Sequence, residues 1–241
     1  MERIEYKRKK IQDHFDSIAT QYSNELPIYF QDYLLKRKMY YITKYCDNLQ
    51  HKIGLDIGCG QGTYLEYLNR ISDKMVGIDF SFNNVKNTLY QNKYGLNCDG
   101  TRLPFKSNYF DFCFTINVIH HLPTRDLQDD FINEMIRVVK PKGKIFIFDL
   151  SLKNPVFSFY LKYIFPRIRS IDEGDELFFN IKKIIKTTVK KTDLISVDYY
   201  SFIPDIIIRP LLNVMIKIEK LIEKTFLKRL AMHQVIILKK K

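Results

Sequence analysis

The chain has 241 residues, of which 46% are hydrophobic and 14% aromatic, with only 9 Gly and 8 Pro. This length and composition support one large folded domain with a sizeable core, and they exclude a wholly disordered chain. The formal net charge is +12, and residues 151–241 hold most of the excess, with 18 basic and 9 acidic side chains. The last third therefore carries either a charged partner surface or simply solvated lysine-rich faces.

Four cysteines lie far apart in the sequence, with no C-x-x-C pair: Cys46, Cys59, Cys98 and Cys113. This pattern predicts reduced thiols in a cytosolic protein and neither a disulfide framework nor a metal cluster. The first ten residues lack the apolar core of a secretory signal. No window approaches 18 uncharged apolar residues, so we expect no transmembrane helix.

Two helices are predicted before the first strand. Residues 11–23 place apolar side chains on one helical stripe. Pro27 suits the first turn of a second helix, which we expect to run from about residue 28 to residue 47.

Strand and helix patterns alternate from residue 53 onward. The predicted strands are 53–57, 75–78, 96–98, 110–116 and 144–150, and the predicted helices are 64–71, 82–92 and 125–139. Because apolar, β-branched strands alternate with helices, the expected fold class is α/β, with a parallel sheet covered by helices on both faces. Residues 140–143 are expected to form a turn.

The last third is less regular. Residues 154–169 are aromatic and apolar but contain two prolines, and residues 177–191 resemble a basic helix. A strand at 194–202, a long amphipathic helix at 206–230 and a final strand at 233–238 complete the chain. The two strands could add an antiparallel edge to the sheet.

Three glycines at alternate positions follow the first strand: Gly58, Gly60 and Gly62. A strand, a glycine-rich loop and a helix together form a nucleotide-type cofactor site, because glycine lets the backbone approach the ligand. The G-x-G-x-G spacing disfavours a dinucleotide, which prefers G-x-G-x-x-G, and the P-loop Lys-Ser/Thr pair is missing.

Acidic residues lie within or directly after the first three predicted strands. Asp79 can accept hydrogen bonds from two ribose hydroxyls, or it can cap the following helix, a role that Ser81 could fill instead. Asp99 is spaced to meet an adenine amine. Asp56 lies inside an apolar strand, where a charge is costly, so we expect it to orient the loop or to reach an ammonium group.

These motifs together resemble the class I S-adenosylmethionine-dependent methyltransferases, especially the ubiquinone/menaquinone-biosynthesis branch with its type 11 domain. The resemblance is strong over about residues 50–150. The segments that carry it are Leu55–Gly62 with Asp79, Cys98–Gly100, Leu103–Phe105, Asp111–Phe112, Asn117–Leu122 and Glu134–Gly143, with a similar N-terminal helix at His14–Tyr22. Lys142 departs from the family, which usually has Gly at that position of the turn.

The resemblance implies a Rossmann-like, seven-stranded, mostly parallel sheet with an antiparallel last strand. It also implies S-adenosyl-L-methionine as cofactor and S-adenosyl-L-homocysteine as product. The expected cofactor-binding residues are Tyr22, Asp56, Gly58, Gly60, Asp79, Phe80, Asp99, Gly100 and Asn117. No metal ligand is expected.

Methyl transfer from a sulfonium is an in-line displacement, so much of its catalysis comes from proximity and orientation. A general base is needed only where the acceptor must lose a proton. His120 and His121 follow the fourth strand, and we select His120 as the candidate catalytic residue. A loop histidine that caps the helix at Arg125 is the alternative.

We therefore predict a methyltransferase with a helical lid at 1–48 and a cofactor-binding domain at 49–241, in which 151–230 selects the substrate. We expect a small-molecule, lipid-linked or glycan-precursor acceptor. A tRNA or rRNA acceptor is the less favoured alternative, since no RNA-binding module is recognisable. A non-catalytic cofactor-binding protein is the third reading.

The basic amphipathic pattern of 206–230 suggests either peripheral contact with an anionic membrane or a helix that faces the core with a solvated charged side. We expect a cytoplasmic protein, and the first of these two readings would place this segment against the inner membrane face. No obligate protein partner is evident in the sequence.

Overall fold

The computed structural model describes residues 2–21, 26–90, 94–168, 176–178 and 181–241. In these ranges seven strands form one sheet in the order β3-β2-β1-β4-β5-β7-β6. The strands are β1 (Ile53–Ile57), β2 (Lys74–Asp79), β3 (Gly95–Asn97), β4 (Phe110–Ile116), β5 (Val139–Leu150), β6 (Thr192–Tyr200) and β7 (His233–Lys240).

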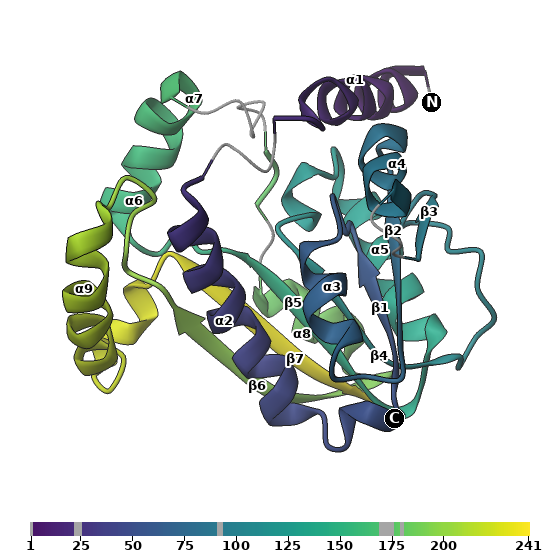
Figure 1. The fold of residues 1–241 in the computed structure, drawn as a ribbon. Helices are drawn as coiled ribbons and strands as arrows, with labels where there is room; N and C mark the ends of the chain where they lie inside the picture. Colours follow the sequence, from purple (N-terminus) through teal and green to yellow (C-terminus); the bar gives the residue numbers. More distant parts are fainter. Residues whose placement is uncertain (1, 22–25, 91–93, 169–175, 179–180) are drawn as a thin grey trace.

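Helices connect the strands and cover the sheet (Figure 1). The α-helices are α1 (Glu2–Ile18), α2 (Ile28–Tyr45), α3 (Thr63–Asn69), α4 (Phe82–Tyr90), α5 (Arg125–Val138), α6 (Pro155–Phe159), α7 (Phe165–Ile168), α8 (Ile181–Thr188) and α9 (Arg209–Ile222). Short 3₁₀ or π segments are η2 (Leu49–His51), η3 (Ile119–His121), η4 (Tyr160–Ile164) and η5 (Phe226–Leu230).

Strands β1 to β5 pair in parallel, whereas β7 runs antiparallel to both β5 and β6. The predicted Rossmann-like sheet with an antiparallel last strand is confirmed. The two closing strands form the antiparallel edge region, with β7 between β5 and β6 and with β6 outermost. The long pairing of β7 with β5, from Lys144↔Lys239 to Leu150↔His233, inserts the last strand into the sheet.

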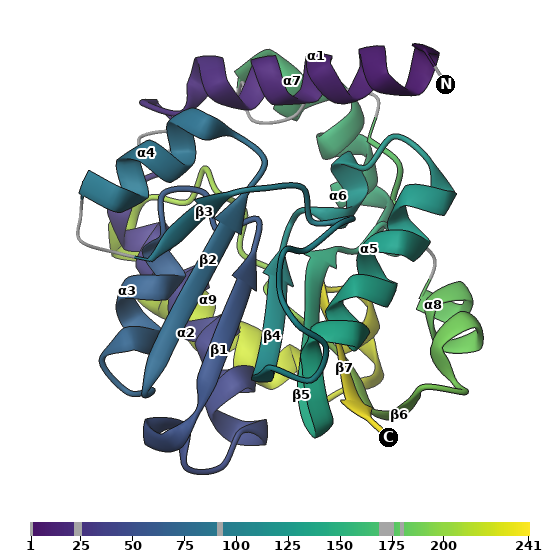
Figure 2. The same ribbon diagram turned by 90° about the vertical axis from the view of Figure 1, so that its right-hand side faces the viewer.

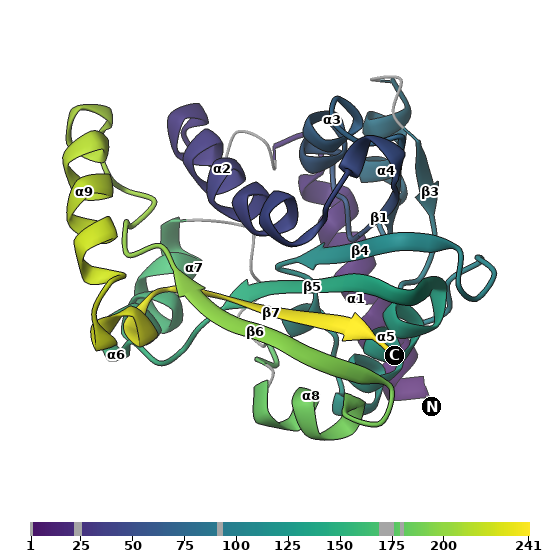
Figure 3. The same ribbon diagram turned by 90° about the horizontal axis from the view of Figure 1, so that it is seen from below.

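Two hydrophobic layers sandwich the sheet (Figure 3). On one face α5 and α8 pack through Phe131, Met135 and Ile184. On the other face α2 and α3 pack Met39, Ile42, Leu65 and Leu68 against aromatic strand residues such as Phe112 and Phe114. The strands are apolar on both faces because both faces are covered.

The carboxyl ends of the parallel strands open towards α1, which crosses that edge of the sheet (Figure 2). The Gln12 side chain donates to the Phe80 carbonyl at 3.1 Å, and Asp16 accepts from the Ser81 hydroxyl at 2.6 Å. These contacts place an N-terminal helix over the edge where a doubly covered sheet binds its ligand.

Several boundaries differ from the sequence predictions. Helix α1 begins at Glu2, well before residue 11, and the predicted helix at 177–191 is reduced to α8. The predicted continuous helix at 206–230 is wrong, because α9 ends at Ile222. Thr225 then accepts a hydrogen bond from the Leu227 N–H at 3.2 Å, which caps a separate 3₁₀ turn.

The predicted turn at 140–143 is instead part of the long strand β5. The β4–β5 pairing shifts register between Phe110 and Phe112, so the extra residues bulge without ending the strand. Lys142 adopts φ 65°, the left-handed conformation that favours glycine. This explains why the related family usually has Gly there, and the departure changes the backbone strain of the bulge without reaching the cofactor edge.

Candidate functional site

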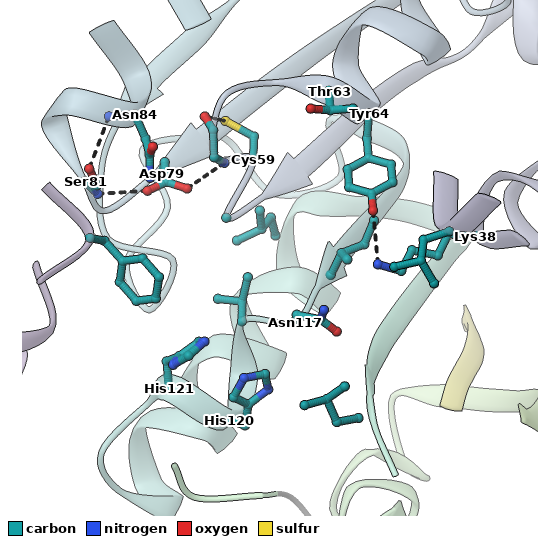
Figure 4. A pocket seen from close by; sticks show the side chains of 18 of the residues that line it. Lys38, Cys59, Thr63, Tyr64, Asp79, Ser81, Asn84, Asn117, His120 and His121 are labelled. Atoms are coloured by element: carbon teal, nitrogen blue, oxygen red, sulfur yellow. Dashed lines mark hydrogen bonds between the residues drawn. The ribbon is translucent and has the colours of Figure 1, made fainter. Parts of the chain in front are cut away.

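A cavity of about 340 Å³ opens at the carboxyl ends of β1, β2, β4 and β5. Helix α1, helix α2 and the segment around α6 supply its remaining walls. Figure 4 shows the side chains that converge there from these separate elements. The predicted site residues other than Asp56 and Tyr22 line the cavity, together with several that the sequence did not indicate.

The glycine-rich loop forms one wall of this cavity. Gly58 has φ 81°, and a Cβ atom there would lie 2.2 Å from a methyl group of Val118. Gly60 has φ 52° but open space around it. Gly58 is thus required both by its backbone conformation and by the packing of the loop that follows β4.

Asp79 holds this loop in place. Its carboxylate accepts hydrogen bonds from the Gly60 N–H at 2.7 Å and from the Ser81 N–H at 2.9 Å. Burial raises the pKa of Asp79, and these hydrogen bonds oppose the rise. The cap of α4 comes from Ser81, whose hydroxyl accepts from the Asn84 N–H at 3.2 Å. Asp79 is therefore not needed as the cap, and its ribose contact stays a prediction.

Asp99, Phe80 and Gly100 lie at the α1 side of the cavity. Asp99 accepts from the Thr101 N–H at 2.9 Å and from the Thr101 hydroxyl at 2.7 Å, and it pairs with the Arg8 guanidinium. Burial raises the pKa of Asp99, but these hydrogen bonds and the Arg8 charge outweigh burial and lower the pKa below its usual range. Arg8 also lies 5.6 Å from the centre of the Phe80 ring. An aromatic ring and an ionised carboxylate thus adjoin each other, and the adenine contact predicted for Asp99 stays a prediction.

Asp56 and Lys38 form a buried but separated pair of opposite charges. Both Asp56 oxygens are buried without a hydrogen-bond partner, and the residue is 1% exposed. Burial raises the pKa of Asp56 well above its usual range, with Asp79 adding to the rise and Lys38 opposing it. Lys38 is 2% exposed, and its Nζ lies 3.0 Å from the Tyr64 hydroxyl (Figure 4).

Burial lowers the pKa of Lys38 to about 7, although Asp149 and Asp56 both raise it. Within the described ranges, no carboxylate lies within 4.0 Å of its Nζ. A buried cation and a buried anion that do not meet suit a zwitterionic ligand between them. The α-amino acid end of S-adenosylmethionine has this charge pattern, so these residues fit the cofactor.

Asn117 follows β4 with φ 56°, and its backbone N–H donates to the Phe148 carbonyl at 3.0 Å. Its side-chain oxygen is buried without a partner. Asn117 therefore also offers an unused acceptor to the cavity, beside the glycine loop (Figure 4).

His120 pairs with Asp149 at the end of β5, with 2.5 Å between Nδ1 and Oδ1. His121 lies partly buried beside it, and its pKa is lowered well below the usual range by desolvation, by His120 and by His14. Neither histidine caps α5, because the Thr124 hydroxyl accepts the capping bond from the Leu127 N–H at 3.3 Å.

The segment after β5 gives the cavity an aromatic wall, formed by Phe157, Tyr160 and Phe165. The Tyr160 hydroxyl donates to Asp205 at 2.6 Å, which ties η4 to the loop before α9. His233 at the start of β7 also lines the cavity, and its Nδ1 is buried without a partner. The side of the cavity away from the glycine loop is thus aromatic and polar.

Tyr22, the remaining predicted cofactor residue, lies outside the described residues. Lys38, Asp149 and His233 were missed by sequence reasoning. Asp149 carries the same signal that identified Asp56, a charge at the end of an apolar strand. Lys38 could have been noticed as a charge between Leu34 and Ile42 on the apolar stripe of its helix.

Residues 55–147 match the model of a methyltransferase domain. The chain carries a class I S-adenosylmethionine-dependent methyltransferase domain. The predicted enzyme class and the predicted cofactor are confirmed for this domain, which contains the glycine loop, Asp79, Asp99 and Asn117. No finding assigns it to the ubiquinone/menaquinone-biosynthesis branch.

Solved methyltransferase structures share this fold. An S-adenosylmethionine-dependent methyltransferase from Thermotoga maritima, described as a possible histamine N-methyltransferase, matches with TM-score 0.65 and 17% identity over 95% of this chain and 100% of that one. A chain of the complex between the Haloferax volcanii Trm112 methyltransferase activator and a methyltransferase matches with TM-score 0.64 and 16% identity over 95% and 96%. At these identities the likeness concerns the fold alone.

Curated relatives of the methyltransferase domain are named for tRNA. The tRNA (carboxymethyluridine(34)-5-O)-methyltransferase ALKBH8 of Mus musculus is 31% identical over 121 residues, 50% of this chain and 18% of that protein. The enzyme of the same name from Arabidopsis thaliana is 38% identical over 93 residues, 39% of this chain and 22% of its own. The Schizosaccharomyces pombe enzyme is 29% identical over 154 residues, which are 63% of this chain and 62% of that protein.

The matched regions thus span between about a fifth and three fifths of these relatives. Our expectation of a small-molecule or lipid-linked acceptor, with nucleic acid less favoured, is wrong, because these relatives are tRNA methyltransferases. No finding tests the peripheral membrane contact considered for 206–230, and it stays a prediction. In the described part of the chain, no helix is both long and apolar enough to cross a membrane.

Proposed function

We propose that this protein transfers a methyl group from S-adenosylmethionine to a nucleotide of tRNA. The observation that supports it most is the naming of its curated relatives as tRNA methyltransferases. The net charge of +12 agrees with a polyanionic partner. The aromatic wall of Phe157, Tyr160 and Phe165 suits a base that has left its stack.

Within this proposal the cofactor extends along the glycine loop. Asp79 would hold the ribose and Asp99, with Phe80 and Gly100, the adenine. At the other end Asp56 would accept from the methionine ammonium. When bound, the cofactor supplies a methyl group on a positively charged sulfur, and the protein positions that group. Asn117 would lie where the cofactor part of the cavity meets the acceptor part.

Lys38 would hold the cofactor's carboxylate, opposite Asp56. The separation of these two buried charges, neither of them ion-paired within the described ranges, supports this assignment. Once bound, the amino-acid end of the cofactor, with its ammonium and carboxylate groups, would compensate the charges of both Asp56 and Lys38.

The domain division also stays a proposal. Helix α1 would act as the lid, since it contacts Phe80, Ser81 and Asp99 through side chains. Helix α2 packs into the hydrophobic layer on one face of the sheet and supplies Lys38. Within residues 1–48, α2 would therefore have a structural role, whereas α1 would be the lid. Residues 151–230 would select the substrate through their aromatic wall.

The decisive experiment is a methylation assay with S-adenosylmethionine carrying a radiolabelled methyl group. Purified protein would receive bulk tRNA, rRNA and a lipid and small-molecule extract in parallel, followed by nucleoside mass spectrometry of the labelled fraction. We expect label in tRNA alone, with binding that weakens as salt rises. Label in another fraction, or binding to tRNA that salt leaves unchanged, would contradict the proposal.

A further inference from the structure

The segment after β5 carries a second set of aromatic side chains, which lie at the protein surface. Helix α6, η4 and α7 follow one another without a break at one side of the molecule (Figure 1). Phe157, Tyr160 and Phe165 of this segment line the cavity. Phe159 and Tyr163 lie on another side of it, outside the cavity lining, and are 57% and 43% exposed. The segment is therefore aromatic towards the cavity and also towards solvent.

Phe159 and Tyr163 form a pair of rings. They are four residues apart and so share one face of the helical segment. Their ring centroids are 4.9 Å apart, and the ring planes are inclined at 46°. Val156, one turn earlier, is 77% exposed and extends this apolar surface. Contiguous apolar surface of this kind marks an interaction site more often than isolated exposed side chains do.

The charge around these rings is positive. Residues 151–168 contain three basic side chains and no acidic one. Lys162 Nζ lies 5.0 Å from the centroid of the Tyr163 ring, and the Arg167 guanidinium donates to the Tyr163 carbonyl. Asp205 bonds to this segment through the Tyr160 hydroxyl, but it is buried. A partner at the exposed rings therefore meets cations and should itself be anionic.

The aromatic character of this surface distinguishes between anionic partners. Proteins that bind unpaired nucleotides combine cations for the phosphates with aromatic rings on which the bases stack. Helix α9 also exposes apolar side chains, but those of Leu211, Val214, Ile218 and Leu221 are aliphatic and offer no ring to a base. The α6–α7 surface is thus the better match for RNA.

We propose that Phe159 and Tyr163 form a stacking surface for unpaired nucleotides of the tRNA, next to the nucleotide that enters the cavity. Lys162 and Arg167 contact the phosphates of these nucleotides. The inference rests on the proposed tRNA activity and specifies where the RNA lies. One short segment then serves both parts of the substrate, with the target base on its cavity side and the neighbouring bases on its exposed side.

Stacking is tested with the full chain and a dye-labelled oligouridylate, an RNA without duplex structure. Phe159→Leu and Tyr163→Leu keep an apolar side chain but remove the aromatic face. Each should weaken oligouridylate binding about tenfold in fluorescence anisotropy, because a base loses its stacking partner. Tyr163→Phe keeps the face and should bind like the wild type. Unchanged binding in both Leu variants would overturn the inference.

The phosphate contacts are tested by the dependence of the same binding on salt. Lys162→Gln and Arg167→Gln should each reduce the slope of log K against log salt concentration by about 0.7, the value for one phosphate of a single strand. A slope that neither substitution changes would show that the phosphates do not meet these two cations, which contradicts the proposal.

Tyr94→Leu is the matched control. Tyr94 is 58% exposed, and Lys74 Nζ lies 4.5 Å from the centroid of its ring, so this pair resembles Tyr163 with Lys162. Lys74 begins β2, however, at the opposite end of the strand from Asp79, and neither residue lines the cavity. The control should bind oligouridylate like the wild type. A loss as large as that of Tyr163→Leu would make the effect a general one and contradict the proposal.

Vesicles of phosphatidylserine test a lipid surface as the other anionic partner. Leucine is as well suited to a membrane interface as phenylalanine is. If the wild type floats with the vesicles and both Leu variants retain vesicle binding as well as oligouridylate binding, the surface belongs to lipid and the inference fails.

Methylation kinetics separate this inference from the proposed function. In the tRNA assay the two Leu variants should raise KM about tenfold and leave kcat near the wild-type value. Calorimetry with S-adenosylhomocysteine should give wild-type affinity, which shows that the variants are folded. A wild-type protein that labels no tRNA would overturn the proposed function. Normal tRNA labelling with KM unchanged in both Leu variants would overturn this inference alone.

Discussion

The two halves of the cavity are built in different ways. The cofactor half uses residues close in sequence, from Gly58 to Asn117, and residues 51–150 hold nearly balanced charge, with 12 basic and 11 acidic side chains. The acceptor half draws on α2, α6 and β7, from opposite ends of the chain, and the last third is strongly basic. The difference suggests that a shared cofactor keeps a local motif, whereas an acceptor site is free to be assembled from distant segments.

The contact between α2 and α9 holds the acceptor half together. Tyr33 donates to Glu219 at 2.5 Å, and the Arg37 guanidinium pairs with Glu219 and Glu223. Burial raises the pKa of Glu223 to about 7, despite Arg37. Tyr29 adds a hydrogen bond of 2.7 Å to the Ile207 carbonyl. A polar network between helices more than 150 residues apart thus decides where α2 and its Lys38 lie.

The largest effect is expected from Gly58→Ala, which should weaken binding of S-adenosylhomocysteine by about 100-fold or more. The new Cβ would meet Val118 at 2.2 Å, and φ 81° would add roughly 1–3 kcal/mol of backbone strain. Isothermal titration calorimetry measures the change. Gly60→Ala, at a position with open space, is the control and should lose much less. Equal losses would show that packing against Val118 does not matter.

Lys38→Met tests whether a residue outside the cofactor motif serves the cofactor half. The substitution should weaken the binding of S-adenosylhomocysteine by about 10- to 100-fold, roughly 1.4–2.7 kcal/mol, because the ligand's buried carboxylate loses its cation. Methylthioadenosine, which lacks the amino-acid end, should bind equally to both proteins. The exposed neighbour Lys36, which pairs only with Asp32 among the described residues, provides the control Lys36→Met. If both ligands weaken alike, Lys38 has a structural role only.

Because of Lys38, we expect the affinity for S-adenosylhomocysteine and the free energy of unfolding to change with pH in opposite directions. The pKa of Lys38 in the fold is about 7, below the usual 10.5, so the unfolded chain holds the proton more tightly. The free energy of unfolding of the free protein should therefore rise with pH between about 7 and 10. Affinity for S-adenosylhomocysteine should fall over the same range as the cation is lost. Denaturant titration and calorimetry measure the two trends, and Lys38→Met should flatten both.

The smallest effect is expected in the acceptor half. Tyr160→Phe removes a hydrogen bond to Asp205, worth about 1 kcal/mol, and should raise KM for tRNA by roughly fivefold. Affinity for S-adenosylhomocysteine should stay at the wild-type value, since Tyr160 lies on the aromatic wall. Steady-state kinetics with a binding measurement in parallel decides the matter. Weaker cofactor binding in this variant would mean that the two halves are not separable.

Sequence reasoning located the cofactor half well, for a physical reason. In a parallel sheet every strand ends at the same edge, so Asp56, Asp79 and Asp99 at successive strand ends had to converge. It failed at 206–230, where Thr225 begins a new turn in spite of the continuous amphipathic pattern. The pattern also indicated that the two closing strands form an antiparallel edge, but it did not reveal that β7 is inserted between β5 and β6.

The sequence by itself determined the α/β alternation, the glycine loop and the set of carboxylates around it. These features depend on the local period of apolar residues and on glycine's backbone freedom, and both signals can be recognised within a short stretch of sequence. Only the tertiary structure decided that Lys38, His120 and His233 line one cavity, with Asp149 paired to His120. Their meeting depends on the β5–β7 pairing and on the α2–α9 network, which are long-range contacts that no local pattern encodes.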